Sequence, residues 1–218
     1  MKPYRDRTDA GTKLAAKLKD YAGTDAVVLG LARGGVPVAA EVARILDLPL
    51  DVMVVRKLGV PGHEELAMGA IASGGMRVLN ADVLDQLAIS DEMLARIAVD
   101  EERELVRMER IYRQGQAPEK LEGRTVILVD DGLATGASMR AAAAAVREHG
   151  PAKIVVAVPV AARETCRHVA SLADDVVCAL TPEPFRAVGV WYNDFSQTTD
   201  EHVREILDHK WGRDDGGG

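Results

Sequence analysis

Short apolar runs alternate with amphipathic stretches along most of the chain. Runs at 26–30, 51–57, 125–130, 153–158 and 174–180 have the length and composition of buried strands. Apolar residues at helical spacing predict a helix before Gly23 and further helices at 36–46, 136–149 and 163–172. Strands that alternate with helices form right-handed crossovers. We therefore expect an α/β fold, a mainly parallel sheet with helices on both faces.

Residues 58–114 interrupt this alternation. Gly59, Pro61 and Gly62 indicate a mobile loop over 58–66, and runs at 68–72 and 76–80 predict a hairpin. A short helix at 82–87 and a long one at 91–114 follow. The long helix has one narrow apolar face, which could pack on the core or on a second subunit: Leu94, Ala98, Leu105, Met108 and Tyr112.

Composition excludes several classes of protein. The 218 residues include 27 Lys and Arg against 34 Asp and Glu, a net charge of −7 that disfavours a broad nucleic-acid surface. No run reaches transmembrane length and the first residues lack the apolar core of a signal peptide, so we expect a cytoplasmic protein without a membrane partner. Cys166 and Cys178 are too few for a disulfide framework or a zinc site, which favours two reduced thiols.

The run 126–138, VILVDDGLATGAS, carries the most chemical information. Its apolar residues form a strand, Asp130 and Asp131 follow at the carboxyl end, and Thr135, Gly136 and Ser138 open a helix. Backbone N–H groups and hydroxyls at a helix start can hold a phosphate, and carboxylates can accept hydrogen bonds from ribose hydroxyls. The alternative is an ordinary turn whose acids cap the helix. The pattern favours a sugar phosphate.

This run closely resembles the phosphoribosyl-diphosphate (PRPP) signature of type I phosphoribosyltransferases. The resemblance implies their fold, with Asp130 and Asp131 holding the ribose beside an oxocarbenium-like transition state. It also implies that one loop binds the 5′-phosphate of PRPP: Ala134, Thr135, Gly136, Ala137 and Ser138.

Two cationic clusters fall at the ends of two other expected strands, where α/β sheets bind ligands. Arg33-Gly34-Gly35 is similar to the Ala-Arg-Gly of adenine phosphoribosyltransferases, and Arg56-Lys57 to the Arg-Lys of adenine and orotate enzymes. The resemblance implies that both clusters bind pyrophosphate and that Arg56 and Lys57 take part in catalysis. The alternative interpretation of Arg33-Gly34-Gly35 is a plain tight turn, and that of Arg56-Lys57 is a pair of cations on the protein surface. Arg33 must turn its backbone toward pyrophosphate within one residue of a strand, so we also expect an unusual backbone within 31–34, and the resemblance implies the non-proline cis bond that related enzymes often have.

Four of the eight aromatic residues lie between positions 185 and 195. They could form a stacking surface for a flat ring or a small satellite core. The stretch 188–194 is similar to the hood of purine phosphoribosyltransferases, which makes Phe185, Val188, Trp191 and Tyr192 candidates for binding a base. The sequence AVPVAAR stands where hypoxanthine–guanine enzymes carry a base-reading lysine, which weakens a 6-oxopurine assignment.

The resemblance divides the chain into a core domain at 1–180, in which 68–114 is an insertion, a hood with a C-terminal helix at 181–211, and a disordered tail at 212–218. It implies an enzyme that transfers phosphoribose from PRPP to a small nitrogenous acceptor and releases pyrophosphate. Mg²⁺ is expected through PRPP, with Asp130 as a candidate ligand, and a homodimer is a candidate assembly. The alternatives are a non-catalytic PRPP-binding regulator and, more weakly, a hydrolase or phosphorylase.

Overall fold

Five parallel strands form the central sheet of the computed structural model, which describes residues 3–61, 63–87, 89–210 and 212. The strand order is β2-β1-β6-β7-β8. Apolar, largely β-branched runs form these strands because both of their faces are buried. The expected parallel sheet is confirmed, with these bounds: β1 (Val27–Leu31), β2 (Leu50–Met53), β6 (Thr125–Val129), β7 (Lys153–Val160) and β8 (Asp175–Leu180).

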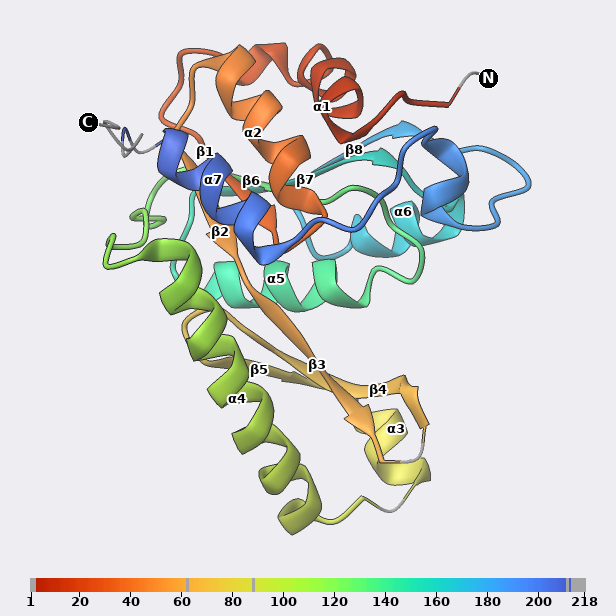
Figure 1. The fold of residues 1–218 in the computed structure, drawn as a ribbon. Helices are drawn as coiled ribbons and strands as arrows, with labels where there is room; N and C mark the ends of the chain where they lie inside the picture. The colour runs from red at the N-terminus through yellow and green to blue at the C-terminus, as the bar shows by residue number, and fades with distance from the viewer. Residues whose placement is uncertain (1–2, 62, 88, 211, 213–218) are drawn as a thin grey trace.

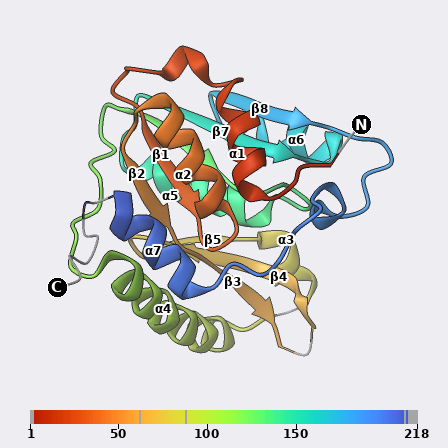
Figure 2. The ribbon, with the colours of Figure 1, turned by 45° about the horizontal axis from the view of Figure 1, so that its top comes forward.

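Helices cover both faces of this sheet (Figures 1 and 2). The helices α1 (Arg7–Ala15), α2 (Gly35–Leu46) and α7 (Asp200–Lys210) lie on one face. The opposite face carries α5 (Ala137–Glu148) and α6 (Arg163–Val169). The helix expected before Gly23 ends at Ala15, and a 3₁₀ turn over Lys19–Tyr21 completes the segment.

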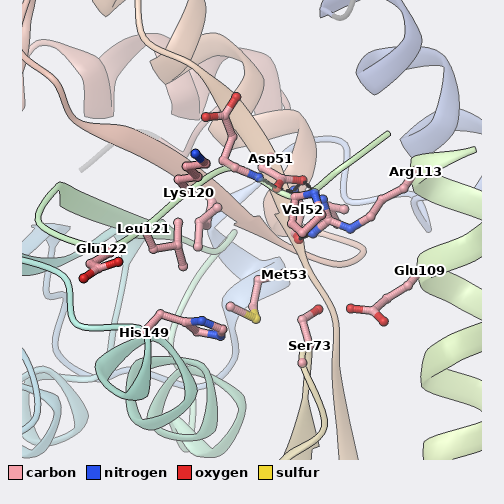
Figure 3. A pocket seen from close by; sticks show the side chains of 14 residues that line it. Asp51, Val52, Met53, Ser73, Glu109, Arg113, Lys120, Leu121, Glu122 and His149 are labelled. Atoms are coloured by element: carbon pink, nitrogen blue, oxygen red, sulfur yellow. Dashed lines mark hydrogen bonds and ion pairs between the residues drawn. The ribbon is translucent and has the colours of Figure 1, made fainter. Parts of the chain in front are cut away.

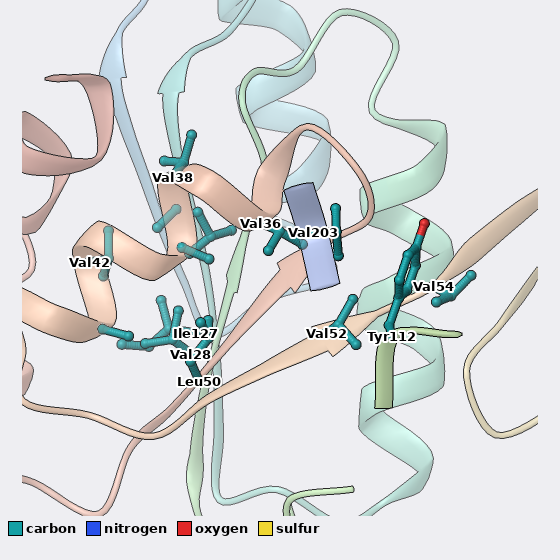
Figure 4. Close-up of a cluster of buried hydrophobic side chains, with 14 of the residues drawn as sticks. Val28, Val36, Val38, Val42, Leu50, Val52, Val54, Tyr112, Ile127 and Val203 are labelled. Atoms are coloured by element: carbon teal, nitrogen blue, oxygen red, sulfur yellow. The ribbon is translucent and has the colours of Figure 1, made fainter. Parts of the chain in front are cut away.

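Strand residues alternate between two buried clusters. Val28 and Ile127 pack toward α2, in the cluster drawn in Figure 4, whereas Val27 and Val126 pack toward α5. This alternation follows from the two-residue period of a strand. Both faces of the sheet are therefore closed to ligands, and the loops at its ends are left for binding.

Residues 55–113 form an arm that projects from the sheet (Figure 1). The antiparallel strands of the arm have the order β3-β4-β5, and α4 packs along them. Ala98, Leu105, Met108 and Tyr112 are buried in the chain's own core, so the apolar face of the long helix packs intramolecularly. The bounds are β3 (Val55–Val60), β4 (His63–Ala72), β5 (Met76–Leu79), α3 (Ala81–Gln86) and α4 (Asp91–Arg113).

Two expectations about the arm are wrong. The single strand expected at 51–57 is divided between two sheets at Val54, whose amide and carbonyl hydrogen-bond with the hydroxyl and amide of Ser73. The loop expected at 58–66 is a β-hairpin in which Leu58 and Val60 are buried. The Gly and Pro residues that suggested a loop coincide with irregular strand pairing around Gly59. Gly62 itself lies outside the described residues, as does the expected tail apart from Gly212.

The expectation of two separate thiols is also wrong, because Cys166 and Cys178 form a disulfide. Cys166 lies on α6 and Cys178 on β8, the strand that follows α6. The return of the chain from helix to strand brings their Cα atoms to 6.6 Å, within the range that a disulfide spans. Among the described residues, no helix has both the length and the apolar character that a membrane span requires.

Candidate functional site

Two adjacent carboxylates lie at the carboxyl end of β6. Asp130 Oδ1 accepts a hydrogen bond of 2.8 Å from the amide of Asp131. Burial raises the pKa of Asp130 well above its usual range, and the neighbouring charge of Asp131 adds to this effect. Burial also raises the pKa of Asp131, although Arg7 opposes the shift. Two acids in this environment can accept ligand hydroxyls or share a cation.

The loop after these acids surrounds a hollow of about 140 Å³. Gly136 has a φ of +73°, which lets the chain turn into α5, and the hydroxyl of Thr165 on α6 donates a hydrogen bond of 2.6 Å to the carbonyl of Ala134. The first N–H groups of an α-helix have no partners within the helix and can bind an anion, and in α5 the amide of Ala137 lies 3.4 Å from the Thr135 hydroxyl oxygen, which accepts its hydrogen bond. The hollow is lined by Asp130, Val188 and the whole expected phosphate loop: Ala134, Thr135, Gly136, Ala137 and Ser138.

The loop between β1 and α2 packs directly on the two acids. The peptide between Ala32 and Arg33 is cis, which confirms the unusual backbone expected there. A Cβ at Gly34 would overlap Asp131 Oδ2, and a Cβ at Gly35 would lie 2.5 Å from the carbonyl oxygen of Val129. Only glycine permits this approach. The structure therefore brings Gly34 and Gly35 against the acids.

The side chain of Arg33 turns toward α7. Its Nη1 lies 3.6 Å from Asp200 Oδ1, and the same carboxylate oxygen accepts a hydrogen bond of 2.6 Å from the phenol of Tyr112 on α4. Arg33 thus belongs to the rim of the site and is connected to the long helix of the arm.

Arg56 and Lys57 lie on β3, and the strand period separates them. Arg56 Nε contacts Glu101 Oε2 on α4 at 2.7 Å. Lys57 lines a second hollow, of about 170 Å³, together with Thr135, Ser138 and Arg140. The structure thus brings Lys57 to the phosphate loop and places Arg56 against α4.

The C-terminal aromatic residues mostly pack into a satellite core. Tyr4 and Tyr192 are buried, with ring centroids 5.5 Å apart, and Phe185 and Trp191 pack against this cluster. The Tyr192 hydroxyl donates a hydrogen bond of 2.6 Å to the Asp131 carbonyl. Of the four candidates for binding a base, Val188 is the one that lines the hollow of about 140 Å³ at the loop 134–138.

Sequence reasoning missed Arg7. Its Nε and Nη2 donate to Asp131 Oδ2 at 3.0 and 2.8 Å across 124 positions of sequence. In the sequence Arg7 is one of several charged residues near the N-terminus, and no local pattern distinguishes it. Asp200 and Thr165 were missed for the same reason, since each reaches the site only through the fold.

A larger hollow, about 590 Å³, lies elsewhere (Figure 3). Leu121 and Glu122 precede β6 and His149 follows α5, so these lining residues are at the opposite end of β6 from the acids. Arg113 donates two hydrogen bonds, of 2.6 and 2.7 Å, to the buried carboxylate of Asp51 beside it. This ion pair fastens α4 to β2.

Comparisons with known proteins agree with this geometry. The family model described as the phosphoribosyl transferase domain matches residues 4–191. The crystal structure of TT1426 from Thermus thermophilus is 45% identical, with a TM-score of 0.83, and the match covers 95% of this chain and 98% of that one.

Curated relatives point the same way. A Mycobacterium tuberculosis protein, provisionally named a phosphoribosyl transferase, is 47% identical over 208 residues, which are 95% of this chain and 47% of the relative. The chain thus spans about half the length of that relative. The hypoxanthine-guanine phosphoribosyltransferase of Streptococcus pneumoniae is 27% identical over 135 residues, or 57% of this chain and 70% of that protein. The match over residues 4–191 confirms the resemblance seen in the sequence: this chain belongs to the phosphoribosyl transferase domain family.

Proposed function

We propose that this chain binds PRPP with Mg²⁺ and transfers the phosphoribosyl group to a small nitrogenous acceptor, with release of pyrophosphate. One observation carries the proposal. The partly buried Asp130 lines a hollow together with the loop 134–138, Asp131 follows it, and the glycines of the Arg33 loop pack against both acids. Carboxylates for ribose hydroxyls and N–H groups for a phosphate are thus adjacent, as a sugar phosphate requires.

In the proposed reaction, the bond from C1 of the ribose to pyrophosphate breaks and a bond from C1 to an acceptor nitrogen forms. The acceptor loses its proton, and pyrophosphate leaves with the bonding electrons. Positive charge develops on the ribose, so the negative charges of Asp130 and Asp131 stabilise the transition state. The loop 134–138 holds the 5′-phosphate and thereby fixes the position of C1.

Positive charge for the departing pyrophosphate would come from the Arg33 loop and the arm. Lys57 lines the hollow beside Thr135 and Ser138, whereas Arg56 is partly neutralised by Glu101. We therefore assign the larger contribution to Lys57 and a smaller one to Arg56.

The donor set fits Mg²⁺ shared with the substrate. In the described part of the chain, no group of three or more His, Cys, Asp or Glu residues could hold a metal ion. Mg²⁺ commonly uses one or two carboxylates together with substrate phosphates, and Asp130 is the carboxylate that lines the hollow. When bound, the ion would neutralise charge on the leaving pyrophosphate.

The proposed acceptor is a flat nitrogen heterocycle, and Val188, which lines the hollow beside Asp130, is the candidate residue for contact with its ring. We propose the cytoplasm as the location, because a multiply charged sugar phosphate does not cross membranes and is used where it is made. The domain limits expected from the sequence remain part of the proposal.

Pyrophosphate release with PRPP, Mg²⁺ and a panel of nucleobases tests the proposal, and calorimetry measures PRPP affinity separately. Hypoxanthine and guanine belong in the panel because the Streptococcus relative carries that name. Asp131→Asn should lower turnover on the order of 10²-fold with little change in affinity, since the charge acts on the transition state.

Lys57→Ala should weaken both affinity and turnover, because its charge meets a pyrophosphate already present in the ground state. Lys17→Ala, at an exposed position after α1, is the matched control and should change neither. Tight binding of PRPP without pyrophosphate release for any acceptor would favour the regulator instead. Absence of PRPP binding would refute the proposal.

A further inference from the structure

We infer that Arg7 is a positioning residue that holds one oxygen of Asp131 and leaves the other for a ribose hydroxyl. The inference rests on the proposed function, because it assigns a role to the acid pair during binding of the sugar phosphate. Arg7 lies in the first turn of α1, outside the β6–α5 unit that carries the acids.

All three guanidinium nitrogens of Arg7 have partners. Nε and Nη2 both donate to Asp131 Oδ2, at 3.0 and 2.8 Å, and Nη1 donates to the carbonyl of Ser196 at 2.7 Å. The guanidinium carbon lies 4.1 Å from the centre of the Phe195 ring. A planar fork held in this way has one orientation, which a lysine ammonium cannot reproduce.

These contacts distinguish the two carboxylate oxygens of Asp131. Oδ2 takes both bonds from Arg7, and it also packs so closely on Gly34 that a Cβ there would overlap it. The main chain of Asp131 is fixed as well, by its amide bond to Asp130 Oδ1 and by the Tyr192 hydroxyl on its carbonyl. Oδ1 takes part in none of these contacts. It is therefore the oxygen to which we assign the ribose hydroxyl.

The start of α1 holds Arg7 in place for this role. Asp6 caps the helix, accepting a hydrogen bond of 2.8 Å from the amide of Asp9, which makes Arg7 the first helical residue. Tyr4 pairs with the segment 191–193. The Tyr4 amide donates to the Trp191 carbonyl, and the Tyr4 carbonyl accepts from the Asn193 amide. The N-terminal segment thus becomes part of the ligand site through one side chain.

The geometry gives this role a measurable signature. The three nitrogen atoms of the Arg7 guanidinium bond to Asp131 and Ser196, and none of these bonds goes to the loop 134–138. Loss of the fork should therefore misplace the Asp131 carboxylate and weaken ligands that carry ribose hydroxyls, while inorganic phosphate should still bind at the loop.

Arg7→Met and Arg7→Lys test the inference in the full chain, with Arg5→Met as the control. Arg5 precedes the same helix, and its side chain is 77% exposed. Calorimetry with PRPP, with ribose 5-phosphate and with inorganic phosphate gives three affinities, and thermal unfolding shows that each variant is folded.

Arg7→Met and Arg7→Lys should each weaken PRPP and ribose 5-phosphate about ten-fold and leave the affinity for inorganic phosphate unchanged. Arg7→Lys should behave like Arg7→Met, because it keeps the charge but loses the fork. Arg5→Met should match the wild type. If Arg7→Met fails to fold, Arg7→Lys still decides the question.

A loss of affinity that is equal for ribose 5-phosphate and for inorganic phosphate would overturn the inference and leave Arg7 a structural role. Wild-type chain that binds ribose 5-phosphate but not PRPP would refute the proposed function alone, and the affinity of Arg7→Met for ribose 5-phosphate would still decide the role of Arg7. Wild-type chain that binds neither ligand would refute both.

Discussion

The Tyr192 hydroxyl donates a hydrogen bond of 2.6 Å to the main-chain carbonyl of Asp131. This bond joins the C-terminal aromatic cluster to the second acid of the site. Burial raises the pKa of Tyr192 far above its usual range, so the phenol stays protonated and remains a donor at every pH of interest.

Tyr192→Phe should lower the free energy of unfolding by about 1–3 kcal/mol, because a partly buried carbonyl loses its partner. It should also weaken PRPP binding, since Asp131 loses one of its restraints. Urea denaturation and calorimetry measure the two effects. Tyr4→Phe is the control. Tyr4 belongs to the same aromatic cluster as Tyr192, but its hydroxyl donates to the main-chain carbonyl of Pro159, at 2.9 Å, and not to that of Asp131. Equal PRPP affinity in both variants would contradict the link to the site.

Gly136→Ala should abolish phosphate binding at the loop. The φ of +73° costs alanine about 1–2 kcal/mol, and the new methyl group would lie 2.8 Å from Thr165 Cγ2, so the loop must move. Gly123→Ala separates the two effects, because Gly123 has a φ of +71° and no atom within 4 Å of its Cβ position. The positive φ should lower the free energy of unfolding by a similar amount in both variants, and only Gly136→Ala should lose affinity for ribose 5-phosphate. Loss of affinity in both variants would point to a general change of fold.

Asp130→Asn should stabilise the folded chain at neutral pH. Burial raises the folded-state pKa of Asp130, so its ionised form is disfavoured. The contribution of Asp130 to stability is complete below the unfolded pKa of about 3.9 and is lost as the pH rises through the folded value, by about 1.4 kcal/mol per pKa unit. The variant should therefore gain stability over wild type as the pH rises from about 4 to 8.

Urea denaturation across that pH range measures the gain, with Asp25→Asn in an exposed turn as the control. A variant that is less stable than wild type at every pH would show that the Asp130 carboxylate is favoured in the fold.

Arg113→Met should destabilise the chain by about 3–5 kcal/mol, because Asp51 is 2% exposed and would be left as a buried charge. The double variant Asp51→Asn/Arg113→Met should recover part of this loss, since the amide oxygen can still accept from the amide of Glu119. PRPP affinity should stay at the wild-type value, because Asp51 lies on the edge strand β2 and neither residue of the pair lines the hollow at the loop 134–138. A double variant no more stable than Arg113→Met would contradict the buried-charge explanation.

Reduction of the disulfide between Cys166 and Cys178 should lower the free energy of unfolding. The two residues are 12 positions apart in the sequence. In the chain-entropy model, a cross-link over a loop of this size contributes about 3 kcal/mol to the free energy of unfolding. Urea denaturation with and without dithiothreitol measures the difference, and mass spectrometry after thiol alkylation counts the free thiols. The double variant Cys166→Ser/Cys178→Ser should not respond to dithiothreitol. Two alkylated thiols in the protein before reduction would show that the bond does not form.

Features encoded in neighbouring residues were predicted correctly from the sequence. Apolar runs and helical spacing are short-range patterns, so the five strands of the sheet and the helices between them followed from local composition. The strand, the turn and the helix start at 126–138 were predicted because they are consecutive in the chain, and the phosphate-binding role of the loop stays a prediction. The unusual backbone at Ala32–Arg33 was predicted from the sharp turn after a strand, and its cis form from the resemblance.

The hairpin at 58–66 shows where local patterns fail. Glycine and proline are usual in loops, yet here the burial of Leu58 and Val60 outweighs that tendency. Such burial depends on α4 and α5, which are distant in the sequence, so no local window contains the information.

The amino-acid sequence by itself therefore determined the α/β architecture, the family and the position of the loop between β6 and α5. Only the tertiary structure decided that Arg7 holds Asp131, that Arg33 pairs with Asp200, that Lys57 and not Arg56 lies beside the loop, and that Cys166 bonds to Cys178. The physical reason is that ion pairs, hydrogen bonds and disulfides depend on distances in space. Those distances are set by how sheet, helices and arm pack, which is a property of the whole chain.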